Sequence, residues 1–153
     1  FSIFMYYLLV IARQVHNRIK RRILIMAKLG RYSANKYKTK SVSSDTTLDK
    51  NDCGKIVFVS ATCTITLPNA ATAGAGWWCR IVKTSGAASG AISITATSDL
   101  NGIGIDGSGV GINLGDDCTI HTDATTGTIL EVVSDGSQWY AVGLASTVNG
   151  FSA

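Results

Sequence analysis

Apolar and polar residues alternate with a period of two along most of the chain after residue 54. Residues 63–67 are the clearest case, because Cys63, Ile65 and Leu67 fall on one face and two threonines fall on the other. This period is that of a half-buried β-strand. Eight runs of this kind are predicted, over residues 55–59, 63–67, 77–83, 91–96, 109–114, 118–121, 128–133 and 139–144.

Turn signals separate these runs at short intervals. Pro68 ends the second run because proline cannot donate to a strand ladder, and Asp135-Gly136 is the signal of a two-residue hairpin. Only residues 69–74 have the composition of a helical turn. The pattern predicts an all-β fold, a single compact antiparallel β-sandwich or small barrel of about eight short strands. No fixed-period repeat is visible, so a long β-helix is not expected.

Charge divides the 153-residue chain into a basic beginning and an acidic remainder. Residues 1–40 carry ten Lys/Arg and no acid, whereas residues 41–153 carry four Lys/Arg and ten acids. Such asymmetry is typical of an interaction tail joined to a folded body. We therefore expect a basic N-terminal arm over residues 26–42, a β-sandwich module over residues 43–146 and a C-terminal tail over residues 147–153.

Residues 1–25 are expected to be upstream sequence read in frame, with Met26 as the true start. Arg21 and Arg22 precede Met26, and AGG or AGA codons there would spell a ribosome-binding site. The alternative is a membrane anchor, because residues 1–12 are apolar. That run is shorter than the roughly 20 residues that span a bilayer.

The basic arm offers five cationic side chains for docking on an acidic surface. They are Lys28, Arg31, Lys36, Lys38 and Lys40. Docking on an acidic partner surface and a solvated tail are both compatible with this composition, and nucleic acid is an unlikely partner.

Two aromatic pairs stand out in the body, Trp77-Trp78 and Trp139-Tyr140. Neighbouring residues on a strand point to opposite faces, so one member of each pair is expected in the core. Trp77 aligns with Cys79 and Ile81, which leaves Trp78 and Tyr140 as candidates for a subunit interface or a glycan contact.

The candidate motifs for catalysis or cofactor binding lack the neighbouring elements or residues that such sites need. The segment from Gly102 to Gly107 matches G-x-G-x-x-G but lacks a following helix, so it is expected to be a loop or a loose strand. His121 has no G-x-S-x-G partner motif, and the five aspartates between residues 99 and 123 lack the order of a calcium loop. No catalytic residue, metal ligand or cofactor is expected, and the four cysteines are expected to be reduced and mostly buried.

The body resembles small β modules of tailed-phage virion proteins, of the tail fibre, head fibre or head decoration type. The resemblance is carried by the order of residues 47–57, 64–68 (TITLP) and 73–77, and by the closing segment 134–143 (SDGSQWYAVG). It implies a non-enzymatic protein of the virion surface, made in the host cytoplasm and often homotrimeric, with capsid or tail proteins as partners.

The function expected from these observations is that of a phage structural protein, most simply a head decoration or short fibre protein. One alternative is a carbohydrate-binding module of a tail fibre that recognises a host surface glycan. A second alternative is a membrane-anchored bacterial surface adhesin, which requires residues 1–25 to belong to the protein.

Overall fold

The computed structural model describes residues 37–84, 90–109, 111–115 and 117–152. The chain divides into residues 1–37 and residues 38–153, and the described structure belongs almost wholly to the second unit. The predictions for residues 1–25 and for Lys28, Arg31 and Lys36 lie outside the described residues. No helix in the described part is long and apolar enough to cross a membrane.

Strands dominate the described residues, with two short helical turns between them. The strands are β1 (Lys38–Val42), β2 (Thr46–Thr47), β3 (Lys55–Val59), β4 (Cys63–Thr66), β5 (Trp78–Lys83), β6 (Ile92–Thr95), β7 (Leu100–Ile105), β8 (Gly111–Leu114), β9 (Asp117–Ile120), β10 (Ile129–Ser134), β11 (Trp139–Leu144) and β12 (Phe151–Ser152). The turns are η1 (Lys50–Asp52) and α2 (Ala70–Ala73), the latter within the segment whose composition predicts a helical turn.

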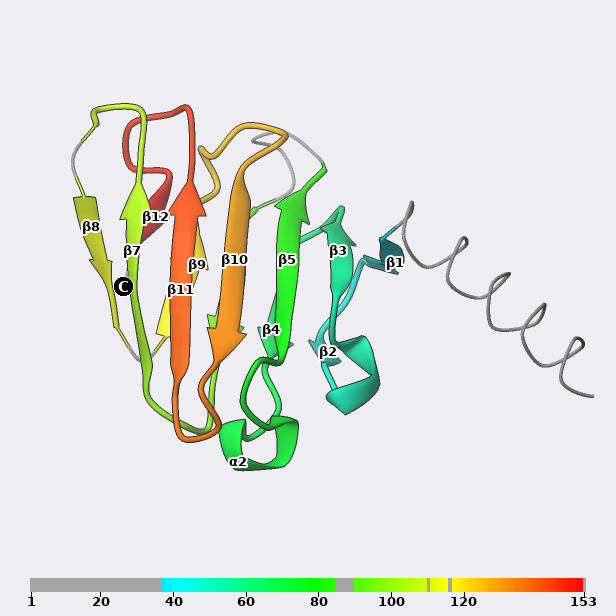
Figure 1. Cartoon of the computed structure of the whole chain (residues 1–153). Coiled ribbons are helices and arrows are strands. Elements are labelled where there is room, and N and C mark those ends of the chain that lie inside the picture. The colour runs from blue at the N-terminus through cyan, green and yellow to red at the C-terminus, as the bar shows by residue number, and fades with distance from the viewer. Residues whose placement is uncertain (1–36, 85–89, 110, 116, 153) are drawn as a thin grey trace, which may run out of the picture. The chain divides into compact units, whose positions relative to one another are not determined.

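These strands form two stacked sheets, so the predicted all-β sandwich is confirmed (Figure 1). The front layer of Figure 1 is a seven-stranded sheet in the order β1-β3-β5-β10-β11-β7-β8. Behind it lies a five-stranded sheet in the order β12-β9-β6-β4-β2. Each strand therefore has one face in the core and one face directed outward.

Half of the strand pairings are parallel, four of them because the first half of the chain alternates between the two sheets and the fifth between β7 and β11. Strands β1, β3 and β5 are parallel neighbours in the large sheet, and β2, β4 and β6 are parallel neighbours in the small one. Each crossing to the opposite sheet and back supplies the long connection that a parallel pair needs. The sandwich is thus mixed rather than antiparallel throughout.

The β-structure also extends beyond the expected module at both ends. Strand β1 uses residues 38–42, which the sequence assigns to the arm, and β12 uses residues 151–152, which it assigns to the tail. Backbone pairing to β3 and β9 recruits these segments, although their own hydrophobic pattern is weak. The expected two-residue hairpin is instead a four-residue loop, because Ser134 pairs with Trp139.

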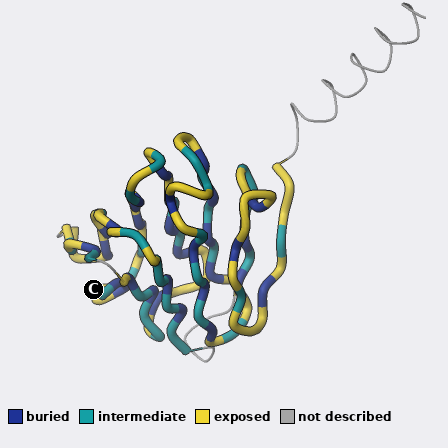
Figure 2. The backbone as a smooth tube through the Cα atoms, turned by 90° about the horizontal axis from the view of Figure 1, so that it is seen from below, coloured by how far each residue is buried: buried dark blue, intermediate teal, exposed yellow. Residues whose placement is uncertain are grey.

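The core lies between the sheets and follows the predicted alternation (Figure 2). Ile65 and Ile94 of the small sheet and Ile81 and Leu130 of the large sheet have no exposed surface. The rings of Trp77 and Trp139 meet edge to face, with centroids 5.1 Å apart. Trp139 also donates its indole N–H to the Pro68 carbonyl at 3.2 Å, so the proline that follows β4 also anchors the central tryptophan.

Candidate interaction surface

The outer face of the seven-stranded sheet is lined mainly by apolar side chains. Strand register places Trp78, Val133 and Tyr140 in one row, and Val142 beside Ile103 in the next. A third row runs through Phe58, Val82, Ile129, Leu144 and Ile105. In the view of Figure 1 this face is turned toward the reader.

Several of these side chains are well exposed. Val142 retains 59% of its surface, Leu144 retains 55% and Ile103 retains 54%. Burying a side chain of this kind removes about 1.5–3 kcal/mol of unfavourable hydration, so a row of them on a free surface is costly. These positions were missed at the sequence level. The alternation in residues 139–144, which sends Trp139 and Ala141 inward, is the signal that could have revealed Val142 and Leu144.

The five-stranded sheet offers an internal comparison, because its outer face is polar. Its outward residues are hydroxyl-bearing or acidic, namely Thr47, Thr64, Thr66, Ser93, Thr95, Asp117, Thr119 and Ser152. A sheet with one face in water normally shows this pattern of apolar residues inward and polar residues outward. The seven-stranded sheet departs from that pattern within the same molecule.

One ion pair lies in the middle of the apolar face. Arg80 of β5 donates from Nε and Nη2 to the same carboxylate oxygen of Glu131 on β10, at 3.0 and 2.6 Å. The two residues are direct neighbours across the strands. At the outward positions of this sheet's described strands, Arg80 and Glu131 are the only charged residues. Their charges cancel, so this part of the surface carries no net charge.

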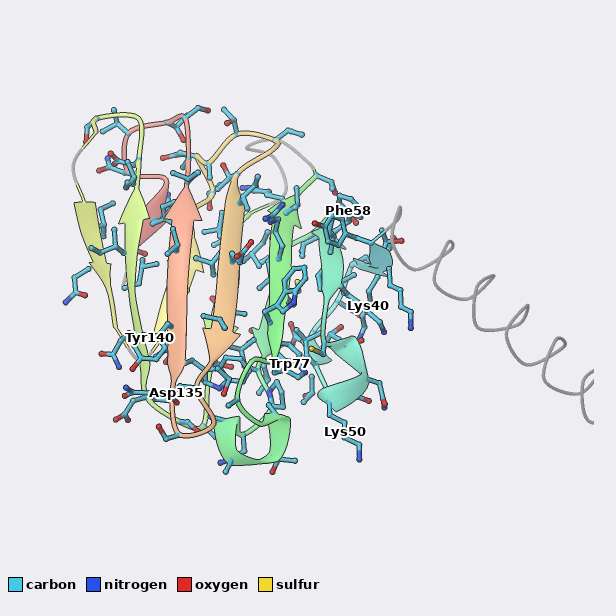
Figure 3. The ribbon with its side chains drawn as sticks, in the orientation of Figure 1. Lys40, Lys50, Phe58, Trp77, Asp135 and Tyr140 are labelled. Atoms are coloured by element: carbon cyan, nitrogen blue, oxygen red, sulfur yellow. The ribbon has the colours of Figure 1, made fainter. Side chains whose placement is uncertain are left out.

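The two aromatic candidates from the sequence, Trp78 and Tyr140, are brought onto the same face. Each lies opposite Val133, one from β5 and one from β11, so two strand spacings of about 4.8 Å separate them. Figure 3 shows Tyr140 near Asp135, and it shows Phe58 well away from both of them, on β3 at the opposite side of the sheet.

The loop between β10 and β11 holds the Tyr140 hydroxyl in place. Tyr140 donates to Asp135 Oδ2 at 3.3 Å and accepts from the Gln138 side chain. The backbone N–H groups of Gln138 and Ser137 both donate to the Asp135 carboxylate and lower its pKa to about 2. The carboxylate therefore stays ionised at physiological pH, and the turn presents a fixed set of polar groups beside an exposed ring.

Two residues of the predicted arm, Lys38 and Lys40, belong to the sheet. Lys40 donates to Asp52 Oδ2 at 2.8 Å, and Lys55 donates to Asp52 Oδ1 at 2.7 Å. Burial alone would raise the pKa of Asp52, but the hydrogen bonds from the two lysines outweigh it and bring the pKa to about 2. The Lys40 ammonium is thus engaged within the fold, whereas Lys38 is exposed.

The glycines of the G-x-G-x-x-G match are needed for packing. Gly104 of β7 pairs with Gly143 of β11, and both lie under the buried ring of Phe151. A Cβ atom at Gly104 would approach the Phe151 ring to 2.8 Å, and one at Gly143 would approach it to 2.6 Å. Residues 102–105 of the segment belong to strand β7 and Gly107 to the loop after it, as the prediction of a loop or loose strand expects.

The acidic residues of the body are dispersed in the described structure. Asp106 accepts from the backbone N–H groups of Ser108 and Asn149, at 2.9 and 2.8 Å, and so connects two loops. Within the described ranges, no three His, Cys, Asp or Glu side chains are grouped closely enough to hold a metal ion. Asp106 therefore has a structural role that the sequence pattern did not reveal.

A second surface feature is a shallow cleft of about 400 Å³ beside the end of β11. It is lined by residues 125–128 and 144–146, most of which carry hydroxyl groups. Two of these hydroxyls, on Thr125 and Ser146, hydrogen-bond to each other at 2.6 Å. The cleft is open, and its lining contains no charged side chain.

Lys83, at the end of β5, is a buried cation that crosslinks two loop segments. Its ammonium donates to the carbonyls of Gly90, His121 and Thr122 at 3.1, 2.9 and 3.0 Å. Burial lowers the pKa of this ammonium, and the nearby Asp123 opposes the change. The three carbonyl contacts account for its hydrogen bonds, so its position is explained by folding rather than by a ligand.

The chain was compared with known proteins in three ways. No family model matches it, no curated protein matches it and no solved structure matches it.

Proposed function

We propose that this chain is a non-enzymatic structural protein of a phage virion, displayed on the particle surface as a head decoration or short fibre protein. The observation that carries the proposal is the apolar outer face of the seven-stranded sheet, which suits assembly with other protein surfaces. The resemblance of residues 47–57, 64–68, 73–77 and 134–143 to phage β modules supports the same assignment. The proposed assembly is homo-oligomeric, and a trimer is what the resemblance implies.

The test of this proposal is the composition of purified particles of the phage that encodes the chain. We expect mass spectrometry to find the chain in stoichiometric amounts, and immunogold labelling to place it on the outside of intact particles. Abundant chain in infected cells but none in particles would contradict the proposal.

Attachment to the particle is proposed to use the basic residues that precede β1. Because Lys40 is bound to Asp52, the docking group is reduced to Lys28, Arg31, Lys36 and the exposed Lys38. Replacing Lys28, Arg31 and Lys36 with Gln is expected to abolish capsid binding in a sedimentation assay. Lys50→Gln, at an exposed position of η1, is the matched control, and capsid binding that survives the triple substitution would refute this part.

Binding of a host glycan is the second candidate function. Trp78 and Tyr140 flank Val133 on one face, and Asp135 and Gln138 provide hydrogen-bonding groups beside the Tyr140 ring. Aromatic rings with adjacent polar groups are suited to stacking on sugars. Glycan-array binding lost in both Trp78→Ala and Tyr140→Ala, but retained in Phe58→Ala at the other side of the sheet, would favour this function.

A further inference from the structure

We propose that a second copy of this chain packs on the apolar outer face of the seven-stranded sheet. This names a surface for the proposed homo-oligomer, and to that extent it rests on the proposed function. A two-fold contact on this surface makes a dimer in place of the trimer that the resemblance implies. The face is the set of outward residues of β3, β5, β10, β11 and β7, whose apolar members are Ile56, Phe58, Trp78, Val82, Ile129, Val133, Tyr140, Val142, Leu144, Ile103 and Ile105.

The first argument is the contrast between the two outer faces. Both belong to sheets of one sandwich, in which the strands of the large sheet have four to six residues and those of the small sheet two to four. One outer face carries Thr, Ser and Asp, whereas the other carries aliphatic and aromatic side chains. Strand propensity favours threonine and valine alike, so it does not explain the difference. A partner that covers one face and leaves the other in water does explain it.

The second argument is the arrangement of polar residues around the apolar ones. The outer strands of the large sheet present Thr39 and Ser41 on β1 and Asn113 on β8, and Asn101 lies at one end of β7. Asn113 is the direct neighbour of Ile103, and Ser41 is that of Phe58. Apart from the Arg80–Glu131 pair, the centre of the face is apolar and its rim is polar, which is the usual composition of a protein interface.

Charge and area identify the partner as another copy. The face is neutral because Arg80 and Glu131 neutralise each other, so a strongly charged partner gains no electrostatic attraction there. A neutral surface does not repel its own copy, and a two-fold contact uses the same surface on both subunits. The five strands of the face and the rim strands β1 and β8 together make seven strands, spaced about 4.8 Å apart and four to six residues long at about 3.3 Å per residue, which gives a projected area of about 30 by 17 Å. The accessible surface of corrugated side chains exceeds this projection and approaches the roughly 800 Å² per partner that a specific interface buries.

The test is the oligomeric state of the full chain, measured by light scattering across a concentration series. The main variant, Val142→Thr with Ile103→Thr and Leu144→Thr, gives this face the threonine pattern of the other sheet. We expect the unmodified chain to have a mass of at least two chains. The triple substitution should raise the dissociation constant by about a hundredfold or more, since three apolar side chains lose their partner surface.

Two further variants control for misfolding and for added charge. Val142→Lys introduces a charge that is costly to bury in an interface, so this variant should be monomeric. Thr119→Lys also replaces an outward β-branched residue with lysine, but on the small sheet, and should leave the assembly intact. Near-ultraviolet circular dichroism of the Trp77–Trp139 pair reports whether each variant is folded.

A monomeric unmodified chain, or an assembly unchanged in folded Val142→Lys, would overturn the proposal. Neither result alters the particle-composition test, so failure of this surface is distinguishable from failure of the proposed function. Glycan binding that is abolished by the triple substitution in a monomeric chain would likewise assign the surface to a sugar and overturn the packing of a second copy.

Discussion

At the scale of single residues, glycine positions control the packing of the last strand. The paired Gly104 and Gly143 form a flat floor, and the Phe151 ring lies on it. Neither glycine has a positive φ angle, so the requirement is lack of a side chain rather than backbone freedom. Gly104 is visible in the sequence as part of a motif, but Gly143 is not. Their common contact with Phe151 depends on the pairing of β7 with β11, so it could be identified only in the fold.

We expect Gly143→Ala to destabilise the protein by about 1–3 kcal/mol, the usual cost of overpacking a closed site. Urea unfolding measures the loss. Gly115→Ala is the control, because an added Cβ there meets nothing within 4 Å. In a Phe151→Leu background the smaller side chain leaves space, so Gly143→Ala should cost less. Equal costs in both backgrounds would show that the ring is not what excludes the methyl group.

At the scale of elements, β1 is attached to the sheet by a charged cluster as well as by its backbone. Asp52 of η1 receives the ammonium groups of Lys40 in β1 and Lys55 in β3, and its side chain is 5% exposed. The capping box of η1, in which Asp49 and Asp52 exchange hydrogen bonds, fixes the carboxylate between the two lysines. A short edge strand with a weak hydrophobic pattern is thereby held in place.

This cluster predicts a pH dependence. The pKa of Asp52 is about 2 in the folded protein, against 3.8 for an unperturbed aspartate side chain. A depressed pKa contributes stability above the unfolded value, and that contribution is lost as pH falls through the folded value. We therefore expect Asp52→Asn to cost about 2 kcal/mol at pH 7, in line with the shift in pKa, and progressively less between about pH 4 and pH 2.

Urea unfolding at several pH values and hydrogen exchange of the β1 amides measure this effect. Asp99→Asn, at an exposed carboxylate, is the control and should change neither. A loss of stability in Asp52→Asn that stays the same from neutral pH down to the folded pKa would contradict the ionic origin.

The element order shows where prediction from the sequence ends. Period-two alternation located strands such as 55–59 and 139–144, because one face of each is buried. The parallel ladders could not be predicted, since register partners Lys38, Lys55 and Cys79 are 17 and 24 residues apart. Each connection between these strands crosses between the same two sheets. The connections differ in length, however, so the sequence shows no repeat of fixed period.

At the scale of the whole molecule, the candidate surface was predictable in part. Alternation alone places Trp78 and Tyr140 outward, and the structure agrees. Trp78 and Tyr140 share one face with Ile103 and Ile105 because β10 and β11 lie between β5 and β7. Long-range strand pairing fixes this order, so alternation alone does not reveal it. The role of Lys40 was likewise hidden, because its partner Asp52 is brought near by the folding of η1.

The thiols offer a test of the sandwich as one cooperative unit. Cys63, Cys79 and Cys118 are buried in β4, β5 and β9, while Cys53 is exposed, and all four are free. Burial raises the pKa of the Cys118 thiol to about 12 and raises the pKa of Cys79 and Cys63 as well, which further suppresses the reactive thiolate.

We therefore expect a thiol reagent to label Cys53 rapidly and the other three together, at a rate set by opening of the whole fold. Cys53→Ser should remove the fast phase alone. Because the three buried thiols belong to both sheets, labelling of one sheet's cysteines well before the other's would show that the layers open separately.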